Sequence, residues 1–450
     1  MLKAYVNSFK IPDLRNKILF TLAILALCRV AAGIPTPGVD AENLTKLFEA
    51  MKQGAGGGLL NIFNLFSGGA LQKFAIAALG IMPYITASIV IQLLIPVIPS
   101  LEKLRREGES GRQKINKYTR YLTLLVCIVQ GTAATKFMMN PGQLMQQAKG
   151  IEVVHNPGPV FAITTVIFLT AGTMLLVWLG EQISDRGIGN GVSLIITINI
   201  LSRVPSAIAG LASLARGGGA GGGNLIYVLL LLAMFFAVCA ATVALTQGQR
   251  KIPIRHARRS AGRGSAQGQT SYLPLRVNYS GVMPIIFGSA VLMFPMLVFR
   301  VVPFTQTWAQ YFQRGSLTYM ISFGIIIILF SFFWVSTQFK PTQIAQNLQK
   351  QGGYVPGIRP GQPTATFLDN TMTRITFAGS LFLTGIAIMP MVLAREFDIP
   401  MTVAAFFGGT SLLIMVSVLL DTMRQIEAYL LSHRYDGFLD KGKLRSRSGF

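Results

Sequence analysis

The sequence predicts an all-α polytopic membrane protein with ten transmembrane helices. Of its 450 residues, 51% are hydrophobic and only 13% are charged. Apolar runs of about 20 residues, the length that a helix needs to cross the hydrocarbon core, recur along the whole chain. The net charge of +23 lies mostly in segments between these runs. In a membrane protein this pattern indicates orientation and acidic partners rather than a soluble nucleic-acid-binding protein.

The spans and the basic residues together define the expected topology. The predicted spans are about 18–32, 71–98, 121–137, 160–179, 192–201 and a little beyond, 225–245, 282–299, 319–339, 375–393 and 403–420. Three large polar segments, 97–120, 247–276 and 340–374, separate some of them, and a basic tail, 426–450, follows the last. Of the 40 Lys and Arg residues, 29 lie on the side of the termini, 10 lie on the opposite side, and Arg29 lies near the end of the first span. The positive-inside rule therefore places both termini and the three large segments in the cytoplasm.

The stretch from Gly54 to Pro99 is predicted to be a broken helix beside a cavity. A glycine-rich start leads into a short apolar piece, 59–66, which Ser67-Gly68-Gly69 interrupts. A longer apolar segment, 71–98, follows with Pro83 in its middle. Only the longer piece can cross a bilayer. The short one is tolerated at membrane depth only if it is buried in protein or lines a cavity, so function is sought there.

A weak internal repeat supports a two-part architecture. The sequence GIMPYI begins at Gly80, and the similar GVMPII begins at Gly281. Each lies in the second span of a set of five, and an odd number of spans per half inverts the second half. Matching interrupted segments in inverted halves are the best sequence indication of a central pathway. The expected halves are 1–210 and 211–450.

The predicted spans carry few ionisable residues and no catalytic motif. No paired nucleophile and base or phosphate-binding glycine loop is visible, so neither an enzyme nor a cofactor is expected. Cys28, Cys127 and Cys239 lie inside spans without close pairing, and neither a disulfide nor a metal site is expected. An inverted-repeat secondary carrier for a small solute or lipid is the alternative function. It predicts buried ionisable groups and small cytoplasmic loops, and the sequence shows the reverse.

The central spans contain branched apolar residues in place of ionisable ones. Ile81 and Ile85 are four residues apart and lie on one helix face, and Val282 and Ile286 hold the equivalent positions in the second repeat. A constriction built from such side chains blocks ions by dewetting and makes no specific contact with the molecule that passes. Periodicity alone favours the simpler interpretation, in which these residues belong to the core or face lipid.

The polar segment 247–276 is strongly basic, and three kinds of partner would suit it. It could lie on anionic headgroups, dock an acidic protein or bind a ribosomal RNA phosphate surface. Its basic residues include Arg250, Lys251, Arg255, Arg258 and Arg259. Composition does not separate the three partners.

Long motifs along the chain resemble one known family. They include NIFNLFSGGAL, ALGIMPYITASIVIQLL, REGESGRQKINKYTRY, WLGEQISDRGIGNGVSLII, LPLRVNYSGVMPIIFGS, IAQNLQKQGGYVPGIRPG and FGGTSLLIMVSVLLDT. In this order and over nearly every span, the chain is similar to the SecY family, the central channel-forming subunits of the bacterial Sec protein translocase. The resemblance implies a protein-conducting channel with ten helices in two inverted five-helix halves around an hourglass pore.

The resemblance also implies roles for individual residues. The narrow pore ring would be formed by Ile81, Ile85, Val192, Ile196, Ile286 and Ile414. A plug of about 59–72 would fill the external funnel; its central residues would be Asn61, Ile62, Phe63, Asn64, Leu65, Phe66, Ser67, Gly68 and Gly69. Gln92 and Asn190 are similar to polar positions of a lateral gate, through which membrane segments would leave into lipid.

Partners and location follow from the same resemblance. The basic segments would receive the SecA motor ATPase or the ribosome through Arg250, Lys251, Arg255, Arg258, Arg259 and Arg359. SecE and SecG would complete a heterotrimer, with SecDF and YidC as further partners. Signal-sequence-bearing precursors would be the substrates, and anionic lipids would surround the complex. The expected location is the bacterial plasma membrane, with both termini in the cytoplasm.

Overall fold

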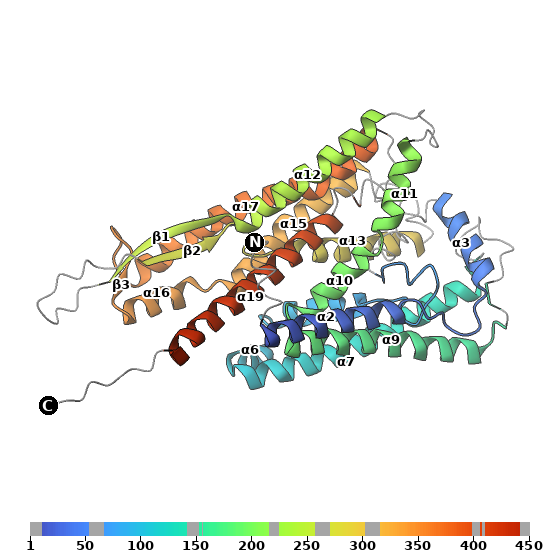
Figure 1. The fold of residues 1–450 in the computed structure, drawn as a ribbon, viewed down its shortest axis with the longest axis horizontal. Coiled ribbons are helices and arrows are strands. Elements are labelled where there is room, and N and C mark those ends of the chain that lie inside the picture. The colour runs from blue at the N-terminus through green and yellow to red at the C-terminus, as the bar shows by residue number, and fades with distance from the viewer. Residues whose placement is uncertain are drawn as a thin grey trace, which may run out of the picture. The chain divides into compact units, whose positions relative to one another are not determined.

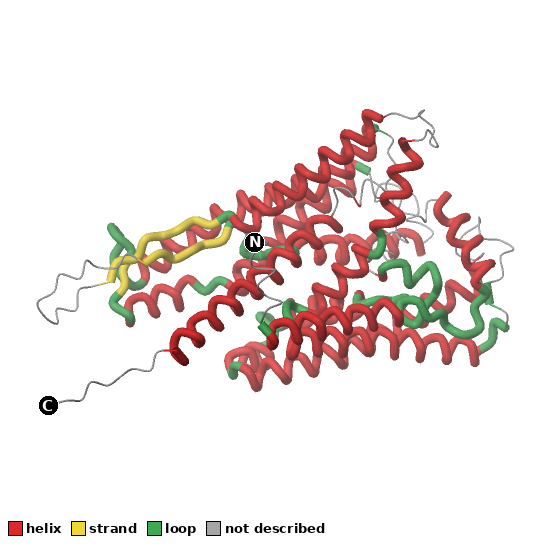
Figure 2. Tube along the Cα trace, viewed as in Figure 1, coloured by secondary structure: helices red, strands yellow, loops and turns green. Residues whose placement is uncertain are grey.

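A computed structural model describes residues 11–53, 67–141, 153–154, 156–215, 225–256, 271–301, 316–397, 406 and 410–441. These residues are mostly helical and include one small sheet (Figure 2). The chain divides into two compact units. The first consists of Met1–Pro205 with Val418–Phe450, and the second of Ser206–Ser417.

The first unit is built from packed helices. They are α2 (Pro12–Ala31), α3 (Ala41–Gln53), α5 (Met82–Leu94), α6 (Pro99–Arg106), α7 (Glu109–Met139), α9 (Pro159–Arg186), α10 (Gly191–Leu201) and the start of α11 (Val204–Ala215). Helix α7 packs against α5, α6 and α9, and α9 also contacts α2 and α10 (Figure 1). Most of these helices are apolar along much of their length. An apolar segment in lipid is helical because each backbone polar group must be satisfied within the segment.

The expected span 71–98 is not one helix. Residues 68–81 form a series of turns, and α5 begins only at Met82. Two local features fix this start: Gly80 has a φ of +60°, and Pro83 lies in the first turn, where its missing N–H costs nothing. A second break follows, since α5 and α6 are bent by 98°. Pro83 therefore begins a helix instead of interrupting one.

The polar segment 97–120 folds into helices. Helix α6 covers its first part, and the start of α7 covers the rest, so α7 is longer than the expected span 121–137. The corner between them is tight, because a Cβ on Gly111 would lie 1.7 Å from the Leu104 carbonyl oxygen. On α7, Arg120 donates two hydrogen bonds to Glu181 of α9, at 2.8 and 2.6 Å.

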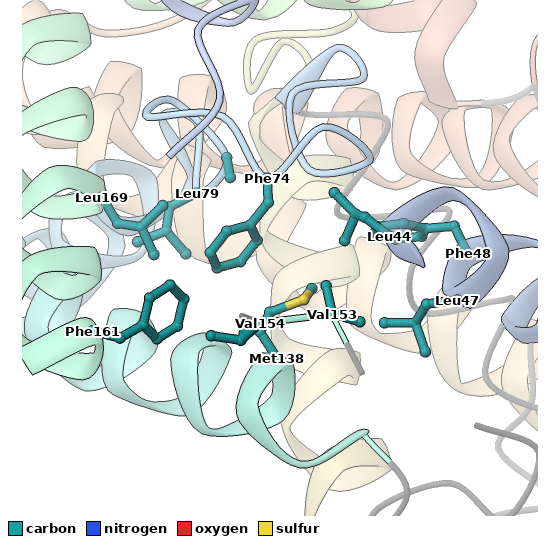
Figure 3. Packing of buried hydrophobic residues seen from close by; sticks show 11 residues of the cluster. Leu44, Leu47, Phe48, Phe74, Leu79, Met138, Val153, Val154, Phe161 and Leu169 are labelled. Carbon is teal, nitrogen blue, oxygen red and sulfur yellow. The ribbon is translucent and has the colours of Figure 1, made fainter. Parts of the chain in front are cut away.

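A hydrophobic cluster holds α3 against the turns that precede α5 and against α7 and α9. Its members include Leu44, Leu47, Phe48, Phe74, Leu79, Met138, Val153, Val154, Phe161 and Leu169 (Figure 3). Phe74 is fully buried near the middle of this cluster. Burial of a side chain of this size stabilises a fold by about 1.5–3 kcal/mol, so the cluster anchors the segment that leads into α5.

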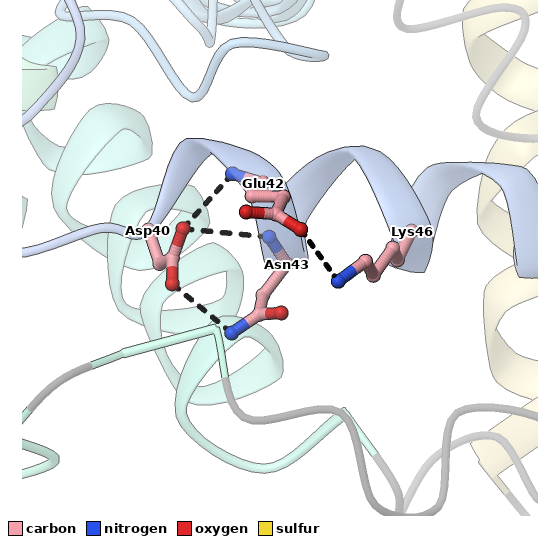
Figure 4. Close-up of polar contacts among 4 residues, drawn as sticks. All are labelled: Asp40, Glu42, Asn43 and Lys46. Carbon is pink, nitrogen blue, oxygen red and sulfur yellow. Dashed lines mark hydrogen bonds and ion pairs between the residues drawn. The ribbon is translucent and has the colours of Figure 1, made fainter.

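Helix α3 is started by a polar cap at Asp40 (Figure 4). The Asp40 carboxylate accepts from the Glu42 backbone N–H at 2.9 Å and from the Asn43 side-chain amide at 3.0 Å. One turn later, Lys46 donates to Glu42 at 2.8 Å, and this hydrogen bond raises the pKa of Lys46. The Asp40 backbone N–H donates to Val153, which ties the start of α3 to a distant segment.

The second unit contains the remaining helices and three strands. Its elements are most of α11, α12 (Leu225–Gln247), β1 (Gln249–His256), β2 (Ser271–Arg276), α13 (Met283–Val301), α15 (Leu317–Gln338), α16 (Pro341–Lys350), β3 (Gly353–Tyr354), α17 (Gln362–Glu396) and the first turns of α19 (Thr410–Lys441). Helix α15 packs between α13 and α17, and α12 contacts α17. From Val418 onward, α19 belongs to the first unit.

The three strands correct the expectation of an exclusively helical chain. They form one antiparallel sheet in the order β2-β1-β3. In β1 the buried Ile252 and Ile254 alternate with the exposed Lys251, Pro253 and Arg255, which is the period of a half-buried strand. The high charge of 247–276 hid this short alternation in the sequence.

Six stretches of the described helices are long and apolar enough to cross a bilayer, or seven if the bent pair α5–α6 counts as one span. They are α7, α9, α10 with the start of α11, most of α12, α15 with α16, and α17. The count is below the expected ten for physical reasons. Every 18-residue window of α2 contains Arg15, Lys17 and Arg29, and α19 becomes charged from Asp421 onward. The apolar described part of α13, Met283–Leu292, is too short.

Candidate functional site: a pore constriction with its plug and docking surface

The six residues expected in the pore ring all lie at the beginnings of helices. Ile81 is the N-cap of α5 and Ile85 lies in its first turn; Val192 and Ile196 lie in the first two turns of α10. Ile286 and Ile414 lie in the first turns of α13 and α19. The first four belong to the first unit and the other two to the second.

In the first unit these side chains are packed closely. Ile81 is 0% exposed, Ile196 3% and Ile85 7%, whereas Val192 is partly exposed. The Ile85 N–H donates to the Ile81 carbonyl at 3.1 Å, which closes the first turn of α5. Both side chains therefore leave successive turns of the same backbone.

The second unit repeats this local geometry. Gly80 and Gly281 have φ angles of +60° and +63°, and each precedes a helix that begins at the second residue after it. The Ile286 N–H donates to the Val282 carbonyl at 3.3 Å, as Ile85 does to Ile81. The sequence repeat is thus also a backbone repeat. The pattern Gly-x-Met-Pro carries this signal, because glycine readily takes a positive φ and proline favours the first turn of a helix.

The expected plug is described only at its C-terminal end. Asn61, Ile62, Phe63, Asn64, Leu65 and Phe66 lie outside the described residues, whereas Ser67, Gly68 and Gly69 are described. We call residues 67–76 the plug root. Two backbone bonds fix its far end to the loop after α2: Thr36 N–H donates to Phe74 at 3.0 Å, and Ile76 N–H donates to Ile34 at 2.9 Å.

Phe74 gives the plug root an unusual backbone. Its φ of +42° lies in the left-handed region, which a bulky side chain adopts only where its surroundings hold it there. The Thr36 hydroxyl also donates to the Phe74 carbonyl, at 2.7 Å, and the ring fills the hydrophobic cluster. The 74–76 end of the root is therefore fixed on both its polar and its apolar side.

The near end of the plug root contacts two helices that sequence reasoning had not connected with it. Arg29 of α2 donates to the Gly68 carbonyl at 3.1 Å and to the Asn199 side-chain oxygen of α10 at 3.1 Å. The Ser202 hydroxyl oxygen lies 3.2 Å from the same carbonyl and 2.7 Å from the Asn199 carbonyl, and it can donate its single proton to either. Arg29 was noticed in the sequence only as a charge near a span end. Intramembrane charges usually mark functional sites, and this was the available signal.

The two residues expected at the lateral gate have different surroundings. The Gln92 amide nitrogen donates to the Ser88 hydroxyl at 3.1 Å, while its buried Oε1 has no hydrogen-bond partner among the described residues. Asn190 is the N-cap of α10, and its side chain accepts from the Ser193 N–H at 3.2 Å. Gln92 thus retains an acceptor for a partner, whereas Asn190 uses its acceptor locally.

The basic residues of 247–276 lie on the sheet of the second unit. Arg250, Lys251 and Arg255 are all exposed. Arg255 pairs in register with Tyr354, so β3 joins the segment 340–374 to the hairpin. Arg359 follows β3 closely and is exposed; its carbonyl accepts from the Thr364 hydroxyl at 2.8 Å. Arg258 and Arg259 lie outside the described residues.

An apolar cluster fastens this sheet to the helices. Its members are Ile252, Leu275, Val335, Phe339, Val355, Leu368 and Met372. They come from both strands of the hairpin, from the residue after β3 and from α15 and α17. The two polar segments expected as separate loops therefore form one supported platform, with Lys251, Arg255 and Arg359 on its surface. None of these three cations has an ion-pair partner among the described residues.

A groove of about 610 Å³ lies elsewhere, between α7 and α9. It is lined mainly by apolar side chains, among them Leu124, Ile128 and Val166. None of the expected pore, plug or gate residues contributes to it, and we do not associate it with the pathway.

Comparisons with known proteins identify the family of this chain. A model of the SecY family matches residues 75–423. The protein translocase subunit SecY of Chlamydia trachomatis serovar D is 42% identical, over 98% of this chain and 98% of the relative. A solved protein conducting channel has a TM-score of 0.62 at 19% identity, with 92% of each chain covered.

Two further solved structures have the same fold, each with a TM-score of 0.59 and 92% of both chains covered. In one, at 19% identity, the plug domain of the SecY protein stabilises the closed state of the translocation channel and maintains a membrane seal. The other, at 18% identity, is the channel of a canine ribosome–channel complex from the endoplasmic reticulum. The family match and the near-full-length relative show that this chain belongs to the SecY family: it is a protein-conducting translocation channel and not an enzyme.

Proposed function

We propose that this chain forms the pore through which unfolded secretory polypeptides cross the plasma membrane and from which membrane segments leave sideways into lipid. The observation that carries the proposal is the buried pair Ile81 and Ile85 with its repeat at Val282 and Ile286. A polypeptide presents every kind of side chain, so a seal around it has to be apolar, deformable and unspecific. Branched apolar side chains meet this requirement and exclude ions when the pore is empty.

We further propose ten spans in two inverted halves, 1–210 and 211–450, around an hourglass pore. The repeated Gly80 and Gly281 turns support this arrangement, because equivalent interrupted helices are typical of inverted-repeat transport proteins. The helices α2, α13 and α19 are the spans that complete the count. The ring then consists of Ile81, Ile85, Val192, Ile196, Ile286 and Ile414.

In this proposal the plug is about 59–72, and Gln92 and Asn190 belong to a lateral gate. The buried unpaired oxygen of Gln92 supports the gate, because a buried acceptor without a partner carries a cost that a second helix or a substrate can remove. Each substrate segment then partitions into lipid according to its own hydrophobicity. An Arg or Asp at the bilayer centre opposes this by about 2.5–3.5 kcal/mol.

The exposed basic platform is proposed to dock the SecA motor ATPase or the ribosome. The sheet supports this proposal, because the apolar cluster holds it in place while Lys251, Arg255 and Arg359 are exposed on it. Among the described residues these cations have no ion-pair partner, so they can contact an acidic surface or RNA phosphates. SecE and SecG are the proposed subunits of a heterotrimer, and SecDF and YidC are further partners. We place the protein in the bacterial plasma membrane among anionic lipids, with both termini in the cytoplasm.

Site-specific crosslinking tests the pore. A photoreactive residue replaces Ile85 in membranes that hold a stalled secretory precursor, and the matched control replaces Leu125, which is 58% exposed on α7. We expect a signal-sequence-dependent crosslink from position 85 and none from position 125. A precursor that is protected inside vesicles but never crosslinks to position 85 would contradict the ring while leaving the channel function intact.

A further inference from the structure

We infer that Arg29 is a latch that holds the near end of the plug root in the closed channel. The inference rests on the proposed plug, and it adds a positioning residue on a helix that carries none of the expected site residues. The guanidinium of Arg29 joins two elements that lie 39 and 170 residues away in the sequence: the Gly68 carbonyl and the Asn199 side chain. The Ser202 hydroxyl can donate its single proton either to the same carbonyl or to the Asn199 carbonyl, which is closer to it.

The latch requires glycine at position 68. Gly68 has a φ of +62°, and a Cβ there would lie 2.5 Å from an Arg29 side-chain nitrogen and 2.9 Å from the Asn199 Cα. The neighbouring Gly69 has a φ of +90°, but a Cβ there would meet nothing within 4 Å. Both positions therefore require an unusual backbone, but only Gly68 is packed against the latch. This difference supplies a matched pair of variants.

The chemistry of the latch suits a bond that must open. Arginine carries five donors in a planar fork, so it can hold two acceptors at once. Both of its acceptors here are neutral oxygens, and among the described residues no carboxylate pairs with it. A buried carboxylate would hold the arginine much more firmly, because breaking such a pair leaves an uncompensated charge. Neutral acceptors hold the root in place and still allow release.

The two ends of the plug root differ in how they are held. At 74–76 the root is fixed by Thr36, by backbone bonds and by the buried Phe74 ring. At Gly68 the backbone carbonyl accepts from the Arg29 side chain, and the Ser202 hydroxyl lies 3.2 Å from it. A plug that leaves the pore therefore pivots about the 74–76 end after Arg29 releases Gly68. Removal of the latch shifts the equilibrium from the closed toward the open state.

Hydrogen exchange tests the latch without relying on transport. The variants are Arg29→Ala, Arg29→Lys, Gly68→Ala and Gly69→Ala, each in the full translocase complex. The Ala70 and Gln72 amides, which donate to Ser67 and Gly69, report on the latched turn, and the Ile76 amide reports on the fixed end. In Arg29→Ala and Gly68→Ala we expect at least about tenfold faster exchange at Ala70 and Gln72, with Ile76 changed less than about threefold. Tenfold corresponds to about 1.4 kcal/mol.

Ion leak through the resting complex in proteoliposomes tests the role of the latch in closure. Arg29→Ala and Gly68→Ala are expected to raise the leak about tenfold, and Gly69→Ala no more than about threefold, because it shares the backbone strain but not the steric clash. Arg29→Lys retains the charge and loses the two-pronged fork, so its leak should be intermediate. A variant that is simply misfolded would instead show fast exchange at Ile76 and in α7.

The outcomes separate the latch from the proposed plug. Unchanged exchange in Arg29→Ala and Gly68→Ala overturns the latch. Faster exchange without a leak overturns its role in closure, and deletion of residues 61–66 then locates the error. If that deletion raises the leak, the plug is correct and only the role of Arg29 fails. If it leaves the leak unchanged, the proposed plug itself is wrong.

Discussion

Gly191 lies at a close contact between α9 and α10, and replacing it gives a sharp test of how the proposed ring residues on α10 are positioned. A Cβ at position 191 would lie 1.8 Å from the Gly180 carbonyl oxygen and 2.6 Å from its carbonyl carbon. Real Cβ atoms essentially never approach closer than 3.0 Å, so the backbones must separate by at least 1.2 Å. Since Val192 directly follows, we expect Gly191→Ala to displace the part of α10 that carries two residues of the proposed ring.

The opposite glycine supplies the control. A Cβ on Gly180 would have as its nearest neighbour the Ile195 Cδ1, at 3.3 Å, the far end of a flexible side chain. Gly180→Ala therefore costs little, and it gains about 1 kcal/mol of helix propensity. Gly191→Ala overpacks a backbone contact, for which a cost of about 1–3 kcal/mol is typical. With about 2–4 °C per kcal/mol for units of 150–250 residues, its unfolding midpoint should fall by about 2–12 °C.

Thermal unfolding of the purified complex, followed through intrinsic tryptophan fluorescence to which Trp178 of α9 contributes, measures this difference. Ion leak through the same preparation measures the effect on the ring, and we expect a higher leak for Gly191→Ala only. Midpoints for both variants within about 1 °C of the unchanged protein would refute the reasoning, because a contact this close cannot accept a methyl group without a shift.

Two further predictions concern charges. Arg359→Glu should lower the affinity for SecA or the ribosome at least about fivefold at low salt, and the loss should shrink as added salt screens the surface charges. The control, Lys350→Glu, makes the same charge change on α16 and should lower the affinity less. Equal losses of affinity in a binding titration would argue against a specific role for Arg359. Arg120→Ala removes the two hydrogen bonds to Glu181. Both side chains are partly exposed (50% and 22%), so the variant should destabilise the first unit by less than about 1 kcal/mol. A fall in the unfolding midpoint that corresponds to a larger loss would show that this ion pair is shielded in the membrane.

The sequence alone determined the membrane class, the expected orientation and the family. Lipid provides no partner for backbone N–H and C=O groups, so a long apolar run that faces lipid has to form a helix. The run 71–98 departs from this at its start, where residues 68–81 form turns. Basic residues set orientation through their number in short segments, which composition records directly. The repeat at Gly80 and Gly281 was also visible, because both the left-handed glycine and the following proline act within one turn of chain.

Tertiary structure alone decided the features that join distant parts of the chain. The polar segments 247–276 and 340–374 meet in one sheet, and Ile252 and Val355 from the two segments are buried in one cluster with side chains of α15 and α17. The composition of either segment alone does not reveal this packing. Arg29 contacts Gly68 and Asn199 only after α2 and α10 have packed with the plug root between them. Such contacts depend on which helix faces pack against one another. The same pattern of apolar spans is compatible with many pairings of helix faces, and close packing of the side chains selects one of them.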